Sequence, residues 1–223
     1  MADDNIPIKQ RLHITFGKHG TLKYTSNLDV AKIWERVLRR AQLPILYTQG
    51  FNARARIQLA SALPLGITSE CEIVDVSLRE AISIDGLVER IAAVSPMGLE
   101  IYSITEVPAR SPALQTLVRS AEYRIRFEED VDRELLRQRV QALLSSDEIA
   151  TTRDRKGKKS VEVDIRPLIY GLTVNDAGDL IAHLAVGSQG NLRPDQIVEQ
   201  LGLADHYYSV HRFRLHLSDE ERA

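Results

Sequence analysis

The same succession of strand-like and helix-like patterns occurs twice in this chain of 223 residues, on either side of segment 107–115, which two prolines interrupt. In the first half, residues 11–16 alternate like a strand, and a helical pattern follows. Either Ser26 or Asn27 caps this helix, which extends to about Gln42. The later elements are strands at about 56–61 and 71–78, a helix at about 84–94 and a strand at 99–107. This half therefore has the order β-α-β-β-α-β.

The second half repeats this order with one addition. Its elements are a strand at 121–127, a helix at about 131–145, a hairpin with the basic tip 153–159, two strands joined by the turn 175–179, a short helix from about Pro194 and a last strand at 207–217. Apart from the hairpin, both halves have the order of the ferredoxin-like fold, in which two helices cover one face of an antiparallel sheet. The sequence therefore predicts an α+β protein with two tandem ferredoxin-like domains, 9–107 with a basic face and 116–218 with the hairpin inserted.

A single cysteine, Cys71, excludes several classes of site within this sequence. It cannot form an internal disulfide, and it cannot supply the thiolates of an iron–sulfur cluster or of a four-cysteine zinc site. The histidines form no HxxxH or HExxH motif, so we expect no bound metal and no cofactor. The glycine-rich nucleotide-binding motifs and the GxSxG motif of serine hydrolases do not occur either.

Hydropathy and the first residues bear on cellular location. No apolar run approaches the roughly 18 residues that a membrane-spanning helix needs. The N-terminal residues are polar and acidic, unlike those of a secretory signal peptide. These features predict a cytoplasmic protein without a membrane partner.

Basic residues are concentrated in one part of the chain. The whole sequence has a net charge of −2, but residues 9–56 contain ten lysines and arginines against only Asp29 and Glu35, which gives this window +8 and the remainder −10. Such a concentration is typical of a surface that binds a polyanion, and it also fits a solvated surface paired with acidic neighbours. Four of the basic residues lie opposite the apolar face of the predicted helix: Lys32, Arg36, Arg39 and Arg40.

The segment 47–56, YTQGFNARAR, combines aromatic, amide and guanidinium groups. Aromatic rings stack on unpaired bases and arginines contact phosphates, so this mixture is typical of proteins that bind single-stranded RNA. A structural loop with Tyr47 and Phe51 in the core is an equally weighted alternative. The predicted RNA-binding residues are Lys18, Lys23, Lys32, Arg36, Arg39, Arg40, Gln49, Phe51, Asn52, Arg54 and Arg56, together with Arg155, Lys156, Lys158 and Lys159 of the hairpin tip.

His19 is the best candidate for a catalytic residue, although the motif is weak. It lies between Gly17 and Gly20, with Lys18 and Lys23 close in sequence. In a ribonuclease, a histidine in such a loop deprotonates a 2′-hydroxyl while a lysine stabilises the phosphate. We favour the simpler interpretation, in which His19 is an exposed loop residue that helps to hold phosphate.

Several longer motifs resemble those of one bacterial family. The most specific are SNLDV followed by WERVLRRAQLP, and QGFNARARI followed by ALPLG; the similarity continues through PALQTLVRSAEY, RPLIYGL and RPDQIVEQLGL. They resemble the radical-SAM-associated family of uncharacterised proteins, a DUF2344-like domain of unknown function, over nearly the whole chain. Members of that family are fused to a radical S-adenosylmethionine protein or stand beside one.

The sequence departs from the family's pattern at three positions. Asn27 stands where the family usually has histidine, and Ala53 and Ala55 stand where it usually has prolines. Asn27 still suits a helix cap but offers no acid–base group. The loss of both prolines makes the loop less rigid.

The resemblance implies a radical S-adenosylmethionine protein as partner, since one cysteine cannot ligate the cluster of such an enzyme. Together with the basic window, it favours a non-catalytic accessory protein that presents tRNA or ribosomal RNA for modification. Two alternatives remain open. One is a metal-independent endoribonuclease, by analogy with the tandem ferredoxin-like enzymes that process CRISPR repeats. The other is a protein–protein adaptor without RNA binding, whose acidic second half binds the partner enzyme.

Overall fold

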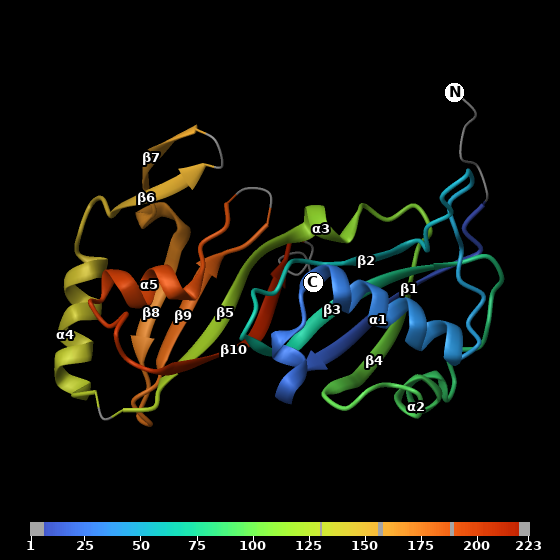
Figure 1. Ribbon diagram of the computed structural model, residues 1–223, viewed down its shortest axis with the longest axis horizontal. Coiled ribbons are helices and arrows are strands. Elements are labelled where there is room, and N and C mark those ends of the chain that lie inside the picture. Colours follow the sequence, from blue (N-terminus) through green and yellow to red (C-terminus); the bar gives the residue numbers. More distant parts are fainter. Residues whose placement is uncertain (1–6, 130, 156–157, 188–189, 219–223) are drawn as a thin grey trace. The chain divides into compact units, whose positions relative to one another are not determined.

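The computed structural model describes residues 7–129, 131–155, 158–187 and 190–218. The chain forms two compact units, of which one ends at Val118 and the other begins at Arg119 (Figure 1). Each unit combines a sheet with helices, so the protein contains both α and β structure. No helix in the described ranges has the length and apolar character that crossing a membrane requires.

In the first unit, the strands have the order β4-β1-β3-β2, with β1 antiparallel to both β3 and β4 and with β2 antiparallel to β3. Its elements are β1 (Gln10–Lys18), the 3-10 helix η1 (Gly20–Tyr24), α1 (Asn27–Arg40), β2 (Ile57–Leu59), β3 (Thr68–Leu78), α2 (Leu87–Ala92), β4 (Leu99–Val107) and the short helix α3 (Leu114–Leu117). Up to the end of β4, the main elements follow the predicted order β-α-β-β-α-β.

Both α1 and α2 pack on one face of this sheet. Trp34 of α1 is fully buried, and its ring meets Phe16 of β1 edge-on, with 4.9 Å between the ring centroids. Alternate residues of β1 face the helices because successive side chains of a strand point to opposite faces. The core cluster includes Leu12, Ile14 and Phe16 of β1, Val30, Trp34, Val37 and Leu38 of α1, and Leu87 and Ile91 of α2.

The ends of α1 are fixed by two local features. The hydroxyl oxygen of Ser26 accepts a hydrogen bond from the Asp29 N–H at 3.2 Å, so Ser26 is the N-cap and Asn27 is the first helical residue. The helix ends at Arg40 rather than at the predicted Gln42, because Gln42 has a φ of 56°, outside the helical range. β2 and α2 are also shorter than predicted.

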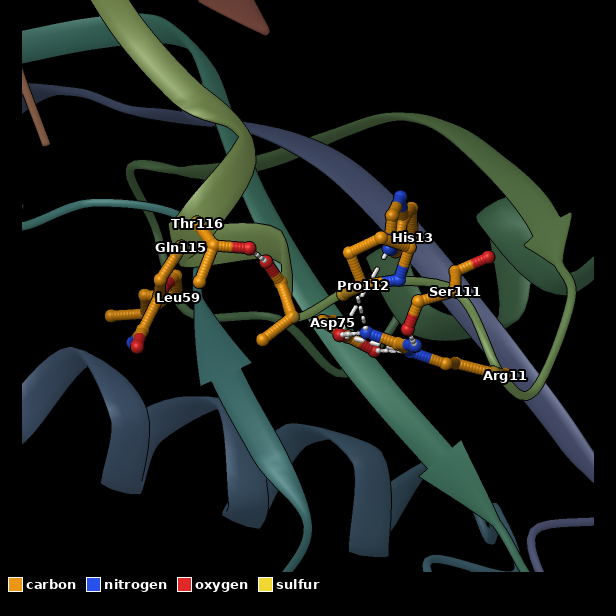
Figure 2. A network of polar contacts seen from close by, with 9 residues as sticks. Arg11, His13, Leu59, Asp75, Ser111, Pro112, Gln115 and Thr116 are labelled. Atoms are coloured by element: carbon orange, nitrogen blue, oxygen red, sulfur yellow. Dashed lines mark hydrogen bonds and ion pairs between the residues drawn. The ribbon is translucent and has the colours of Figure 1, made fainter. Parts of the chain in front are cut away.

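The opposite face of this sheet carries a buried ion pair between Arg11 of β1 and Asp75 of β3 (Figure 2). The Arg11 Nε donates to both carboxylate oxygens of Asp75, at 2.9 and 3.0 Å, and the two side chains are 8% and 6% exposed. The other guanidinium nitrogens donate to the backbone carbonyls of Ser111 and Pro112. Hydrogen bonding to Asp75 raises the pKa of Arg11. One charged pair thus ties the chain after β4 to the two inner strands.

The helix α3 continues this attachment. The side-chain amide of Gln115 donates to the Leu59 carbonyl of β2 at 3.1 Å (Figure 2). The hydroxyl of Thr116 donates to the Ala113 carbonyl at 2.7 Å, and Leu114 is fully buried. Residues 111–117 are therefore held against the first unit by hydrogen bonds and by packing.

In the second unit, the strands have the order β10-β5-β9-β8, with β9 antiparallel to β5 and β8. Its elements are β5 (Val118–Phe127), α4 (Arg133–Leu144), β6 (Ala150–Arg155), β7 (Lys158–Asp164), the 3-10 helix η2 (Arg166–Leu168), β8 (Ile169–Val174), β9 (Leu180–Ala185), α5 (Pro194–Gln200) and β10 (Tyr208–Leu217). β6 and β7 form a separate antiparallel hairpin where the sequence predicts one. When the strands of each unit are numbered in chain order without this hairpin, the strands of both units have the order 4-1-3-2.

Two acidic residues fix local structure in the second unit. α4 begins at Arg133, two residues later than predicted, because the Asp132 carboxylate accepts the N–H groups of Glu134 and Leu135 at 2.8 and 3.1 Å. At the end of the turn before β9, the buried Asp179 accepts hydrogen bonds from Arg126 at 2.8 and 2.9 Å. These bonds lower the pKa of Asp179.

Substituting Asp75 by alanine is expected to destabilise the first unit by about 3–5 kcal/mol, because Arg11 then stays buried without its carboxylate. Combining Asp75→Ala with Arg11→Met removes both charges and should restore much of this loss. Trp34 is the only tryptophan of the chain, so its fluorescence during urea unfolding reports on the first unit.

The exposed pair of Arg79 and Glu80 provides a matched control. Its atoms lie 3.5 Å apart, and the side chains are 64% and 66% exposed. Glu80→Ala should change the free energy of unfolding by less than about 0.5 kcal/mol, because solvent screens such pairs. Equal losses for Asp75→Ala and Glu80→Ala would contradict a structural role for the buried pair.

Candidate functional site

Four basic residues of α1 form an exposed row, which we call the α1 stripe: Lys32, Arg36, Arg39 and Arg40. Spacings of three and four residues place them on the side of the helix opposite Trp34. Lys32 makes an exposed ion pair with Asp29 at 3.2 Å, and hydrogen bonds from Ser26 and Lys32 lower the pKa of Asp29. Within the described part of the chain, the three arginines of the stripe have no carboxylate at ion-pair distance. Their charges are available to an anionic ligand.

The loop of residues 48–54 has exposed residues between two fixed ends. The Thr48 N–H donates to the Arg54 carbonyl at 2.9 Å, and the Arg54 N–H donates to the Thr48 hydroxyl oxygen at 3.0 Å. Next to them, Tyr47 and Ala55 form a β-bridge. Gly50 has a φ of 117°, a conformation that favours glycine. The loop is thus closed at its base and open to solvent along residues 49–53.

The two aromatic residues of this segment have different environments. Phe51 is fully exposed, with Gln49, Asn52 and Arg54 exposed near it in sequence. Tyr47 packs against the core, and its hydroxyl donates to Glu35 at 3.3 Å. Partial burial and Glu35 raise the pKa of Tyr47. The alternative of a core position therefore holds for Tyr47 and is wrong for Phe51.

An open pocket of about 470 Å³ connects the α1 stripe with the base of the loop. Arg39 lines it from α1, Tyr47 and Thr48 from the loop base, and Arg79 from the end of β3. Arg79 is not among the residues predicted from the sequence, because it lies forty residues after Arg39 and joins it only through the fold. Arg56 is half-buried and lines a different pocket of about 370 Å³ together with Arg11 and Asp75.

Lys18 and Lys23, which are also predicted RNA-binding residues, are less exposed than the residues of the α1 stripe. Lys18 is 2% exposed, and its ammonium group donates to the backbone carbonyl of Thr25 at 2.8 Å. The prediction that Lys18 contacts RNA is therefore wrong, because its charge is buried where it holds the chain between β1 and α1. Lys23 is half-buried, with its Nζ 5.1 Å from the centre of the Tyr24 ring.

His19 takes part in a small polar cluster with two residues of β4. Its Nε2 lies 2.8 Å from the Tyr102 hydroxyl, which donates to Glu100 at 3.2 Å, and 3.7 Å from the Glu100 carboxylate. Desolvation and Glu100 raise the pKa of Tyr102 to about 12, so this hydroxyl keeps its proton at neutral pH. A Cβ atom at Gly17 would lie 2.2 Å from the Tyr102 oxygen, so the cluster requires glycine there. Tyr102 and Glu100 could not be predicted from the sequence, because only the β1–β4 pairing brings them to His19.

The basic hairpin tip is described only in part. Arg155 ends β6 and Lys158 begins β7, where the two residues pair across the hairpin, and Lys159 follows in β7. The side chains of these three residues, and Lys156 altogether, lie outside the described residues. Among the side chains that are described, no group of three or more histidines, cysteines or carboxylates is arranged to hold a metal ion.

Comparison with known proteins places the chain in a family. No curated protein matches it. A chain of the solved structure entitled "Crystal Structure of a Cbf5-Nop10-Gar1 Complex" matches with 12% sequence identity and a TM-score of 0.48, over 92% of this chain and 48% of that chain. This protein thus spans about half the length of that solved chain. The family described as "Uncharacterized protein conserved in bacteria (DUF2344)" matches residues 11–194, and the chain belongs to this family.

Proposed function

We propose that this protein binds single-stranded RNA through the α1 stripe and the 48–54 loop, as a non-catalytic accessory protein. One observation carries the proposal: a fully exposed phenylalanine on a loop with fixed ends lies in the same unit as three exposed arginines that have no carboxylate partner among the described residues. Arg39 of the stripe and Thr48 at the loop base line the same pocket. Arginines attract phosphates whatever the sequence, whereas a ring stacks only on a base that is unpaired. This combination favours a single strand over a duplex.

The individual side chains suit different parts of such a ligand. Arg36, Arg39 and Arg40 offer guanidinium groups to successive phosphates, and Phe51 offers a ring to one base. The amides of Gln49 and Asn52 provide donors and acceptors for base edges. Because phosphate contacts position a strand without reading it, any sequence preference should come from the loop.

We also propose that the two units are tandem ferredoxin-like domains, 9–107 and 116–218, with the β6–β7 hairpin as an insertion in the second. The strand order 4-1-3-2 in both units and the matching succession of elements support this assignment. Arg155, Lys156, Lys158 and Lys159 of the hairpin would form a second contact with RNA.

The proposed partner is a radical S-adenosylmethionine enzyme in the bacterial cytoplasm, to which this protein would present tRNA or ribosomal RNA for modification. The resemblance of the sequence motifs supports this part of the proposal. The single cysteine supports a separate enzyme for the radical chemistry, because the iron–sulfur cluster of such an enzyme needs several thiolates.

A metal-independent endoribonuclease is the second candidate function. The cluster of His19, Tyr102 and Glu100 favours it, since a carboxylate and a protonated hydroxyl next to an imidazole can orient that imidazole for proton transfer. RNA cleavage in the presence of EDTA that disappears in His19→Ala would support this function in place of the accessory role.

Removing two stripe charges, in the variant Arg36→Ala/Arg40→Ala, should weaken RNA binding at every sequence tested. Each phosphate contact on a single strand contributes about 0.7 to the slope of log K against log salt concentration, so the slope should decrease by about 1.4. Fluorescence anisotropy with an unstructured RNA oligonucleotide at several salt concentrations measures this slope. Alanine is the best helix former, so α1 should tolerate the change.

The matched control is Arg110→Ala/Arg137→Ala, which removes two exposed arginines outside the α1 stripe. It should leave the slope unchanged although the net charge changes equally. Equal slopes for both double variants would show that the stripe is only a solvated surface. Absence of any salt-dependent RNA binding by the unaltered protein would favour the protein–protein adaptor.

Replacing Phe51 by alanine should reduce the affinity for RNA without altering the salt slope, because stacking releases no counterions. Loss of one stacked base costs about 1–3 kcal/mol, roughly 5- to 150-fold in Kd. Phe51 is fully exposed, so thermal stability should stay the same. The same titrations measure the effect, and Tyr24→Ala, which removes another exposed aromatic residue of this unit, is the control.

The partnership is tested by mixing this protein with a radical S-adenosylmethionine enzyme from a bacterium that encodes both. We expect co-elution in size-exclusion chromatography and modification of an RNA only when both proteins are present. Modification at an equal rate without this protein would contradict an accessory role while leaving RNA binding intact.

A further inference from the structure

The pocket between the end of α1 and the base of the 48–54 loop is lined by two arginines and by no carboxylate. Arg39 comes from the last turn of α1, and Arg79 directly follows β3. Both side chains are exposed, and that of Arg79 is 64% exposed. Two guanidinium groups from distant parts of the sequence thus border one pocket.

Backbone hydrogen bonds fix the points from which the two arginines project. After α1, the Gln42 N–H donates to the Arg39 carbonyl at 3.0 Å, and the positive φ of Gln42 turns the chain. Two residues later, the Pro44 carbonyl accepts the Arg79 N–H at 2.9 Å. One short turn therefore connects both arginines through the backbone, and both line the opening beside it.

The rest of the lining is mostly apolar. The pocket has a volume of about 470 Å³, in the range of small-molecule sites. The half-buried Tyr47 lines it, with its hydroxyl already donating to Glu35. The Thr48 hydroxyl oxygen accepts the Arg54 N–H, so its own proton is free for another acceptor. Three buried apolar residues complete this part of the lining: Leu43, Ile45 and Leu46.

Both arginines are accessible to an anion in this pocket. Partial burial and Glu35 raise the pKa of Tyr47, and the charge of Arg39 opposes this rise, so Arg39 acts on the pocket electrostatically. Arg79 makes one exposed ion pair, with Glu80 at 3.5 Å, and Glu80 does not line the pocket. Solvent screens such a pair, whereas a phosphate accepts two parallel hydrogen bonds from one guanidinium group. A phosphate therefore replaces Glu80 at little cost.

We propose that this pocket holds one nucleotide of the RNA strand, with its phosphate between Arg39 and Arg79 and with its sugar and base against the apolar lining. This assignment rests on the proposed RNA binding, and it adds a residue outside the α1 stripe to the RNA contacts. A phosphodiester has two terminal oxygens, so two guanidinium groups can share it. The strand then passes from the α1 stripe to the loop at this pocket.

A shared phosphate predicts a distinctive salt dependence. Arg39→Ala and Arg79→Ala should each weaken binding of an unstructured RNA oligonucleotide about fivefold. Each single variant leaves one guanidinium group on the phosphate, and only the double variant removes this contact. The slope of log K against log salt concentration should therefore decrease by about 0.7 in the double variant. Fluorescence anisotropy measures both quantities, and Arg110→Ala, an exposed arginine outside the pocket, is the control.

Glu80→Gln tests the same contact through a gain in affinity. It removes the carboxylate that competes with phosphate for Arg79, so RNA binding should become about twofold tighter. In the Arg79→Ala background the same substitution should have a smaller effect. The matched control is Glu89→Gln, which removes an exposed carboxylate on α2 and should leave the affinity unchanged.

A titration with uridine 5′-monophosphate tests the pocket without a longer strand. The NMR signals of the Tyr47 ring should shift more with uridine 5′-monophosphate than with uridine at the same concentration. In Arg39→Ala/Arg79→Ala this difference should disappear. The fluorescence of Trp34 shows whether each variant is folded.

The outcomes separate this pocket from the RNA-binding proposal. Unaltered RNA affinity in a folded Arg79→Ala variant would overturn the assignment of Arg79 while RNA binding stands. A slope that decreases by about 1.4 in Arg39→Ala/Arg79→Ala would overturn the shared phosphate, because it indicates two separate contacts. Absence of RNA binding by the unaltered protein would overturn the proposed function, and equal shifts of Tyr47 with the nucleotide and with uridine would overturn the pocket by itself.

Discussion

The ion pair between Arg11 and Asp75 is the contact on which the first unit depends most. It joins the two inner strands, β1 and β3, and its remaining donors hold the backbone at Ser111 and Pro112. A buried charge without its partner is far more costly than an apolar pair, so substitution of Arg11 or Asp75 alone should be poorly tolerated. Arg11 and Asp75 hold the strands and the chain after β4 together on one face of the sheet, and α1 packs against the opposite face. This packing buries the Trp34 side of α1 and leaves the side with the α1 stripe exposed.

Sequence patterns predict the features that depend on neighbours in the chain. The amphipathic spacing around Trp34 predicts α1, and the choice between two possible capping residues narrows to Ser26 because its hydroxyl reaches the N–H of Asp29. The order of strands and helices in each unit follows from similar local signals. Gln42 is an exception. The helical pattern of the sequence extends to this residue, but its positive φ lies outside the helical range and the helix ends at Arg40.

Features that depend on contacts between distant parts of the chain cannot be predicted from local sequence patterns. Lys18 has the residue type of a phosphate ligand, but the turn into α1 closes over it and uses its charge for backbone carbonyls. Tyr102 and Arg79 join their neighbours only through strand pairing, which no local pattern encodes. His183 of β9 and His216 of β10 illustrate the same limit, because their ring centroids lie only 4.8 Å apart. They are 33 residues apart, in strands where a single histidine usually has a structural role.

The closed base of the 48–54 loop has a consequence for how this protein can diverge. Its two ends are tied by backbone groups and by one threonine hydroxyl, and none of the residues between them contributes to the core. Apart from Gly50, whose φ of 117° favours glycine, mutations at those positions should therefore have little effect on folding. The exposed side chains of this loop can thus change while the scaffold stays unchanged.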